Sequence, residues 1–122
     1  MKHLATAIPV LLLLAVACKT PTGVPADPSF STDIQTIFNN HCVACHGNSS
    51  PPAGYSLTGH AGATGAGSDT IPNVVPGNAD SSKLYRRVTG TETPLMPAGQ
   101  PALDTLKTAT IRNWIDRGAK NN

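Results

Sequence analysis

The sequence predicts an all-α fold of three to four short helices joined by long loops. Three segments, residues 30–41, 78–88 and 104–117, carry apolar side chains three and four positions apart, which is the spacing of a helix face. Strand-like runs rich in Val and Ile are absent from the sequence. Gly and Pro contribute 11 residues each to a chain of 122, and only 4% of the residues are aromatic. We therefore expect at most one domain, with a core that needs further apolar material.

The N-terminal 29 residues are expected to lie outside the fold. A basic start and an apolar run over residues 4–17 are typical of a secretory signal peptide, assigned to 1–17. The residues before Cys18 resemble the lipobox of bacterial lipoproteins, so Cys18 is predicted to be acylated, with an ordinary A-x-A cleavage as the alternative. Residues 18–29 hold three prolines and predict a flexible tether, and the domain is assigned to 30–122.

The first predicted helix covers residues 30–41. Thr32 and Gln35 fit a capping box, and Asp33 places negative charge in the first turn. The apolar stripe of this helix consists of Ile34, Ile37 and Phe38.

Residues 42–46 read CVACH, with Cys42 and Cys45 three positions apart and His46 next. This spacing is typical of c-type haem attachment, in which each thiol adds to one porphyrin vinyl group and the histidine becomes the proximal iron ligand. A zinc site is disfavoured, because Cys18 is the only other cysteine and no second ligand pair follows. A thioredoxin-like pair would need strands, which the sequence does not predict. The motif predicts one covalent haem c, which would also complete the core.

The segment after the motif is rich in turn-forming residues. A backbone carbonyl in this segment, with Pro51 and Pro52 as candidates, is expected to accept the Nδ1 proton of His46. Residues 59–70 are small, polar and glycine-rich, and predict a mobile surface loop. This loop contains His60, the rival for the distal iron position, although a lone histidine there is more often solvated.

The second predicted helix covers residues 78–88, with Asn78 or Asp80 as its cap. Its inner face is predicted to consist of Leu84, Tyr85 and Val88. Three basic residues of this helix are interpreted as a solvated face: Lys83, Arg86 and Arg87. The alternative is that their side chains approach haem propionates or an acidic partner.

Met96 lies in a loop between Pro94 and Pro97, where ordinary core packing explains it poorly. Met1 leaves with the signal peptide, so Met96 would be the only methionine of the mature chain. A thioether opposite a histidine raises the reduction potential of haem iron. Met96 is therefore predicted to be the second axial ligand.

The last predicted helix covers residues 104–117. Asp104 is its expected N-cap, and Gly118 is expected to adopt the left-handed conformation after its end. Its apolar stripe consists of Ile111, Trp114 and Ile115.

Residues 30–119 resemble a class I monohaem cytochrome c, especially a bacterial exported group. The resemblance depends on CxxCH and on three further stretches: VVPGN (74–78) followed by Ser82 and LYRRV (84–88), MPAG (96–99), and IRNWIDRGA (111–119). It implies an all-α fold in which the first and last helices cross, and one-electron transfer between larger redox proteins outside the cytoplasm. The long insertion around His60 departs from short members of the family.

We accordingly expect an electron carrier rather than an enzyme, exported to the periplasm or cell surface, with unidentified redox proteins as donor and acceptor. The net charge of +2 does not suggest a nucleic-acid binder, which would carry clustered Lys and Arg residues, so nucleic acid is not expected as a partner. A small-molecule substrate is not expected either. Two alternatives stay open. One is a haem enzyme or a gas or peroxide sensor whose distal position is vacant or ligated by His60. The other is a fixed haem-bearing subunit of a membrane redox complex.

Overall fold

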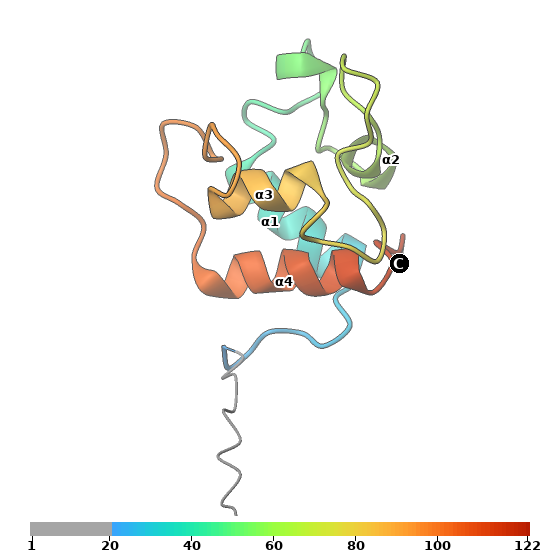
Figure 1. Cartoon of the computed structure of the whole chain (residues 1–122), viewed down its shortest axis with the longest axis vertical. Coiled ribbons are helices and arrows are strands. Elements are labelled where there is room, and N and C mark those ends of the chain that lie inside the picture. The colour runs from blue at the N-terminus through green and yellow to red at the C-terminus, as the bar shows by residue number, and fades with distance from the viewer. Residues whose placement is uncertain (1–20) are drawn as a thin grey trace, which may run out of the picture.

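The computed structural model describes residues 21–122, so the predicted signal peptide and Cys18 lie outside the described residues. Within residues 21–122 the fold contains helices and no strand, which confirms the all-α prediction. In chain order, the four α-helices, the π-helical turn η1 and the 3-10 turn η2 of these described residues are η1 (Phe30–Ile34), α1 (Gln35–His41), η2 (Pro52–Gly54), α2 (His60–Thr64), α3 (Lys83–Thr89) and α4 (Thr105–Asp116). Figure 1 shows α3 beside α4, with α1 behind them and the loops on the side away from α4.

The predicted first helix consists of a π-helical turn, η1, that continues directly into α1. The amides of Ile34 and Gln35 donate to carbonyls five residues earlier, those of Ser29 and Phe30. The N-cap is Ser29, whose hydroxyl accepts from the Thr32 amide at 3.5 Å. The predicted Thr32 and Gln35 capping box is therefore wrong, because the wider turn moves the cap back along the chain.

The core lies where η1, α1, α3 and α4 meet. Trp114 is 1% exposed, and its ring centroid lies 5.5 Å from that of Phe30 in η1. Phe30 also packs edge to face on Phe38 of α1, with centroids 6.4 Å apart. The predicted stripes of the first and last helices are all buried in this core: Ile34, Ile37, Phe38, Ile111, Trp114 and Ile115.

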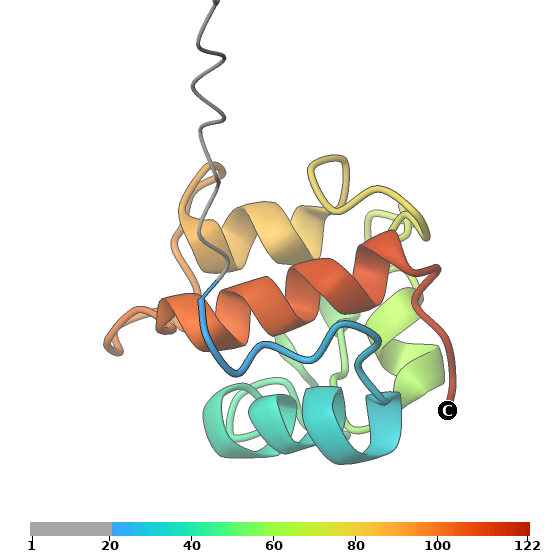
Figure 2. The same ribbon diagram turned by 90° about the horizontal axis from the view of Figure 1, so that it is seen from below.

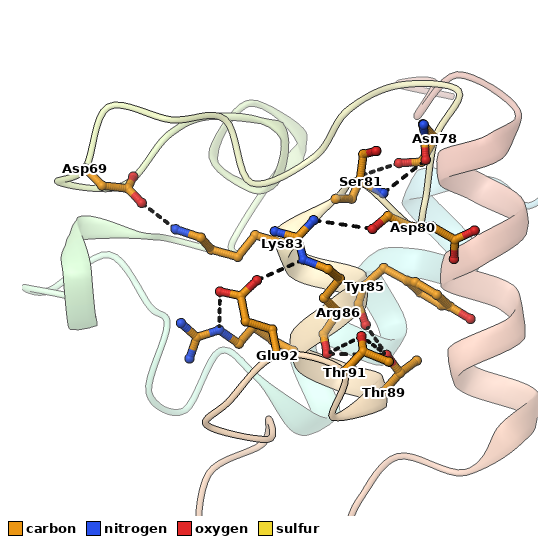
Figure 3. Close-up of polar contacts among 12 residues, drawn as sticks. Asp69, Asn78, Asp80, Ser81, Lys83, Tyr85, Arg86, Thr89, Thr91 and Glu92 are labelled. Atoms are coloured by element: carbon orange, nitrogen blue, oxygen red, sulfur yellow. Dashed lines mark hydrogen bonds and ion pairs between the residues drawn. The ribbon is translucent and has the colours of Figure 1, made fainter.

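The second helix, α3, begins five residues later than predicted. Neither Asn78 nor Asp80 is its N-cap; that position is taken by Ser82. The Asn78 side chain instead accepts from the Ser81 amide at 3.0 Å within the preceding turn (Figure 3). Several residues before α3 are suitable N-caps by type, and the tertiary contacts of the turn before α3 select Ser82, the last of them. Leu84 and Val88 are buried as predicted, whereas Tyr85 is only partly buried against the core.

The two ends of α4 agree with prediction. The Asp104 carboxylate accepts from the Lys107 amide at 2.9 Å, which satisfies one of the free amides of the first turn. Gly118 has a φ of +99°, the left-handed conformation expected after the helix.

The prediction of a mobile loop over residues 59–70 is wrong in part, because residues His60–Thr64 form α2. Ala63 is fully buried, and its carbonyl accepts from the Tyr55 hydroxyl at 2.7 Å. Contacts made by distant residues therefore order a segment whose own composition favours a loop.

The described part of the predicted tether contacts the domain. The Asn113 side chain on α4 donates to the Pro25 carbonyl at 2.9 Å, and Pro28 is fully buried. Figure 2 shows this segment, in blue, crossing the face of α4.

Candidate functional site

A cavity of about 930 Å³ opens between the end of α1, one side of α3, the start of α4 and the loops that connect them. Its lining is mostly apolar and brings together residues that are distant in the sequence. All four haem-binding residues predicted from the sequence line it: Cys42, Cys45, His46 and Met96. The apolar side chains that complete its walls include Tyr55, Leu57, Leu84, Val88 and Leu103.

The CxxCH residues form a tight turn directly after α1. The amide of Cys42 still donates to the Phe38 carbonyl at 2.8 Å, so the motif starts from the end of the helix. The carbonyl of Cys42 then accepts from the amides of Cys45 at 3.1 Å and of His46 at 2.8 Å. This turn presents both thiols and the imidazole to one cavity.

The two cysteines of the motif are free thiols in different surroundings. Cys42 is half-buried and Cys45 is exposed. Burial raises the pKa of the Cys42 thiol to about 11.

His46 is oriented by Tyr55. Its Nδ1 lies 2.7 Å from the Tyr55 carbonyl oxygen, and because a carbonyl can only accept, Nδ1 carries the proton. The Nε2 atom is then left with its lone pair and could bind a metal ion. The sequence correctly predicted a backbone carbonyl partner, but the choice of Pro51 or Pro52 is wrong. A hydrogen bond from the Leu57 amide to the His46 carbonyl, 2.8 Å long, brings this part of the chain back past the histidine.

The loop that carries Met96 is fastened to α3. The Met96 amide donates to the Arg87 carbonyl at 2.9 Å. Glu92, at the start of the loop, accepts from Nε of Arg86 at 2.9 Å and from Nε of Arg87 at 3.1 Å (Figure 3). The hydrogen bond from Arg86 is the main cause that lowers the pKa of Glu92, so the carboxylate stays charged to lower pH.

Two of the three α3 cations line the cavity, which corrects the prediction of a wholly solvated face. Lys83 and Arg87 lie one turn apart and share the cavity with Leu84, whereas Arg86 is not among the lining residues. Lys83 pairs with Asp69 from the glycine-rich segment (Figure 3). The sequence could have predicted this, because residues 83 and 87 lie one helical turn apart and each precedes an apolar residue of the inner face, 84 or 88.

His60 lies outside the set of residues that line the cavity. Its Nε2 donates to the Ala119 carbonyl at 2.6 Å. Its ring packs edge to face on Phe30 and Trp114, at centroid distances of 5.0 and 6.1 Å. The structure therefore places His60 in the core contacts near the C-terminus and does not bring it to Met96 or His46.

These residues fit a covalent haem. The cavity is within the size range of cofactor pockets, and its walls are mainly apolar, as a porphyrin requires. Thiols, an imidazole with its Nδ1 already bonded and a thioether are the donor set of c-type haem proteins. Lys83, Arg87 and Lys107 supply cationic groups at the same cavity, suited to carboxylates at the edge of such a group.

Comparison with known proteins agrees with this chemistry. Residues 42–99 match the family model described as Planctomycete cytochrome C. The match covers the CxxCH motif and Met96, and it supports a cytochrome c-like domain with covalently bound haem and a role in haem-based electron transfer. No curated protein matches the chain significantly. No solved structure does so either.

Two further features of residues 21–122 bear on other kinds of site. No helix in this range is long and apolar enough to cross a membrane. Over the same residues, no group of three or more His, Cys, Asp or Glu side chains could hold a metal ion directly.

Proposed function

We propose that this protein carries single electrons on one haem c, attached through Cys42 and Cys45 and ligated by His46 and Met96. The observation that carries the proposal is that these four residues, from two separate loops, line a single apolar cavity. The haem, when bound, supplies the one-electron chemistry of its iron. The protein binds, orients and shields that group.

Three features of the chain serve this role. The Tyr55 carbonyl holds the Nδ1 proton of His46 and so fixes which nitrogen faces the cavity. The Met96 amide and the Glu92 carboxylate of the same loop both contact Arg87 on α3, and these contacts hold the thioether at the same cavity. If His46 and Met96 both ligate the iron, they would leave no open position for oxygen or peroxide, which favours a carrier over an enzyme.

We further propose the organisation of the whole chain. Residues 1–17 are a signal peptide of the lipoprotein type, Cys18 is acylated, 18–29 connect the lipid to the domain, and 30–122 form the cytochrome domain. The protein then acts in the periplasm or at the cell surface, attached to a membrane. Its partners are a redox protein that donates the electron and another that accepts it, with no nucleic acid and no small-molecule substrate.

The test is spectroscopic and uses protein produced with its signal peptide in a host that matures c-type cytochromes. The wild type is expected to retain haem on a denaturing gel and to show a low-spin spectrum with the weak long-wavelength band of sulfur ligation in the oxidised state. Met96→Ala is expected to lose that band and to bind carbon monoxide when reduced. The matched control is Leu95→Ala, the neighbouring residue, which is 40% exposed and should change neither property.

Carbon monoxide binding by the reduced wild type would contradict the carrier assignment and favour a haem enzyme or gas sensor with a vacant distal position. Retention of the sulfur band in Met96→Ala would contradict the ligand assignment. Loss of covalent haem in both Cys42→Ala and Cys45→Ala is expected from attachment through two thioether bonds.

A further inference from the structure

A segment before the first helix, which we call the N-terminal strap (residues 23–29), is docked on the domain. Pro25 accepts from the Asn113 side chain on α4 at 2.9 Å, and Asp27 lies 3.4 Å from the Lys120 ammonium group. At its end, the Ser29 hydroxyl donates to the carbonyl of Asn122 at 3.0 Å. Pro28 is fully buried between these contacts. The strap is therefore part of the folded surface.

The strap crosses α4 on the side opposite α3 and the loops, which supply most of the cavity lining. Figure 1 shows it below α4, with α3 and the loops above, and Figure 2, viewed from below, shows it in front of α4. A small hollow of about 250 Å³ under the strap is lined by residues from η1, α1 and α4, including Thr36 and Leu106. Of its lining, Lys107 alone is shared with the large cavity.

The docked strap shortens the reach of the chain between Cys18 and the domain. From Cys18 to Gly23 the chain advances five residues, which span at most ~18 Å when fully extended. If the strap were free, the twelve residues from Cys18 to Phe30 would span up to ~43 Å. A domain of about 100 residues has a radius of gyration of about 13 Å, or about 34 Å across as a sphere. The five free residues of the docked chain span less than this width, whereas twelve would span more, so the docked strap keeps Cys18 on its own side of the domain.

We propose that the strap fixes the orientation of the protein on a lipid surface, with the face under α4 toward the membrane and the cavity toward the aqueous phase. The inference rests on the acylation of Cys18 in the proposed function. It implies that the redox partner approaches from the aqueous side, as a soluble protein or an extrinsic domain, rather than within the plane of the membrane.

The experiment uses the full-length, isotope-labelled holoprotein purified from membranes, in the reduced state, in bilayer discs that contain a lipid with a paramagnetic headgroup. The amide signals of Thr36 and Leu106 are expected to be attenuated several-fold more strongly than that of Gly99 beside Met96. Equal attenuation, or stronger attenuation at Gly99, would overturn the proposed orientation.

A variant with a loosened strap tests whether the docked strap causes this orientation. Pro25→Gly, Pro28→Gly and Asn113→Ala together remove the Asn113 hydrogen bond and the buried Pro28 ring and make the strap backbone more flexible, and an unchanged haem spectrum verifies that the domain still folds. The attenuation of the Thr36 amide signal is then expected to become equal to that of the Gly99 amide signal. A variant that keeps the wild-type pattern would show that the strap does not set the orientation.

Failure of the acylation proposal has a separate signature. The intact mass of the purified protein reports whether Cys18 carries acyl chains. If it does not, Cys18 can be joined to a maleimide lipid, since Cys42 and Cys45 are occupied in the holoprotein, and the same two amide regions then test the orientation on its own.

Discussion

The Tyr55 carbonyl lies 2.7 Å from Nδ1 of His46, nine residues earlier in the chain. The same residue donates its hydroxyl to the Ala63 carbonyl in α2 at 2.7 Å. The two rings also meet edge to face, with centroids 5.7 Å apart. Tyr55 thus connects the histidine of the motif to α2, and α2 in turn contacts the C-terminus through His60 and Ala119.

The hydroxyl of Tyr55 is expected to stabilise the fold measurably. Tyr55→Phe removes the donor and leaves the buried Ala63 carbonyl without its partner, at a cost of about 1 kcal/mol. For a domain of this size, that lowers Tm by roughly 4–8 °C in thermal unfolding of the holoprotein. Tyr85→Phe is the control, because the Tyr85 hydroxyl is half-exposed and receives only a 3.3 Å contact from Arg112. An equal loss in both variants would contradict the role of Tyr55.

Glu92 is expected to hold the Met96 loop. Glu92→Gln removes the charge that both Arg86 and Arg87 contact, and the loop is fastened next to Arg87. The sulfur-ligation band of the oxidised protein is expected to weaken, with a larger fraction of unligated iron. The control is Asp69→Asn, which breaks the Lys83 pair at the same cavity but does not touch the loop. An unchanged band in Glu92→Gln would show that the backbone contacts hold the loop alone.

The parts of this site that the sequence predicted are local. CxxCH, Met96 between prolines and the caps of α4 each depend on residues a few positions apart, and the structure places the motif and Met96 at one cavity as expected. The Tyr55 carbonyl and α2 could not be predicted in this way. The identity of a residue says nothing about where its carbonyl points, and α2 depends on contacts between residues 59 positions apart, His60 and Ala119.

The glycine at the centre of α2 shows how tertiary contact outweighs propensity. A Cβ at Gly62 would lie 2.5 Å from the Ser56 carbonyl oxygen, so Gly62→Ala should destabilise the protein although alanine favours helix by about 1 kcal/mol. Gly59→Ala is the comparison, since a Cβ there meets nothing within 4 Å and the change loses only the preference of the α2 N-cap for glycine over alanine, so it should cost less. Chemical unfolding of the two variants provides the comparison. A stabilised Gly62→Ala would mean that α2 can move away from Ser56.

Arg112 and Asp80 form a bidentate pair, with both N–O distances at 2.9 Å, that ties the turn before α3 to α4. The hydrogen bonds from Arg112 lower the pKa of Asp80 below its usual 3.8. A lowered native pKa means that the unfolded state binds the proton more readily. The pair's contribution is therefore present above about pH 4 and is lost as the pH falls through the native pKa of Asp80.

In Asp80→Asn, the free energy of unfolding should consequently fall less steeply as the pH is lowered below about 4. Its pH dependence near neutral pH should be unchanged. Arg112→Gln is expected to produce the same effect, and the double variant should lose little more than either single one, because the two side chains act as one unit. Urea unfolding across the acid range measures all three. Additive losses would show that Arg112 acts mainly through its other partners rather than through Asp80. These partners are the Tyr85 ring, 5.2 Å from the guanidinium carbon, and Asp116, 3.4 Å from Nε of Arg112.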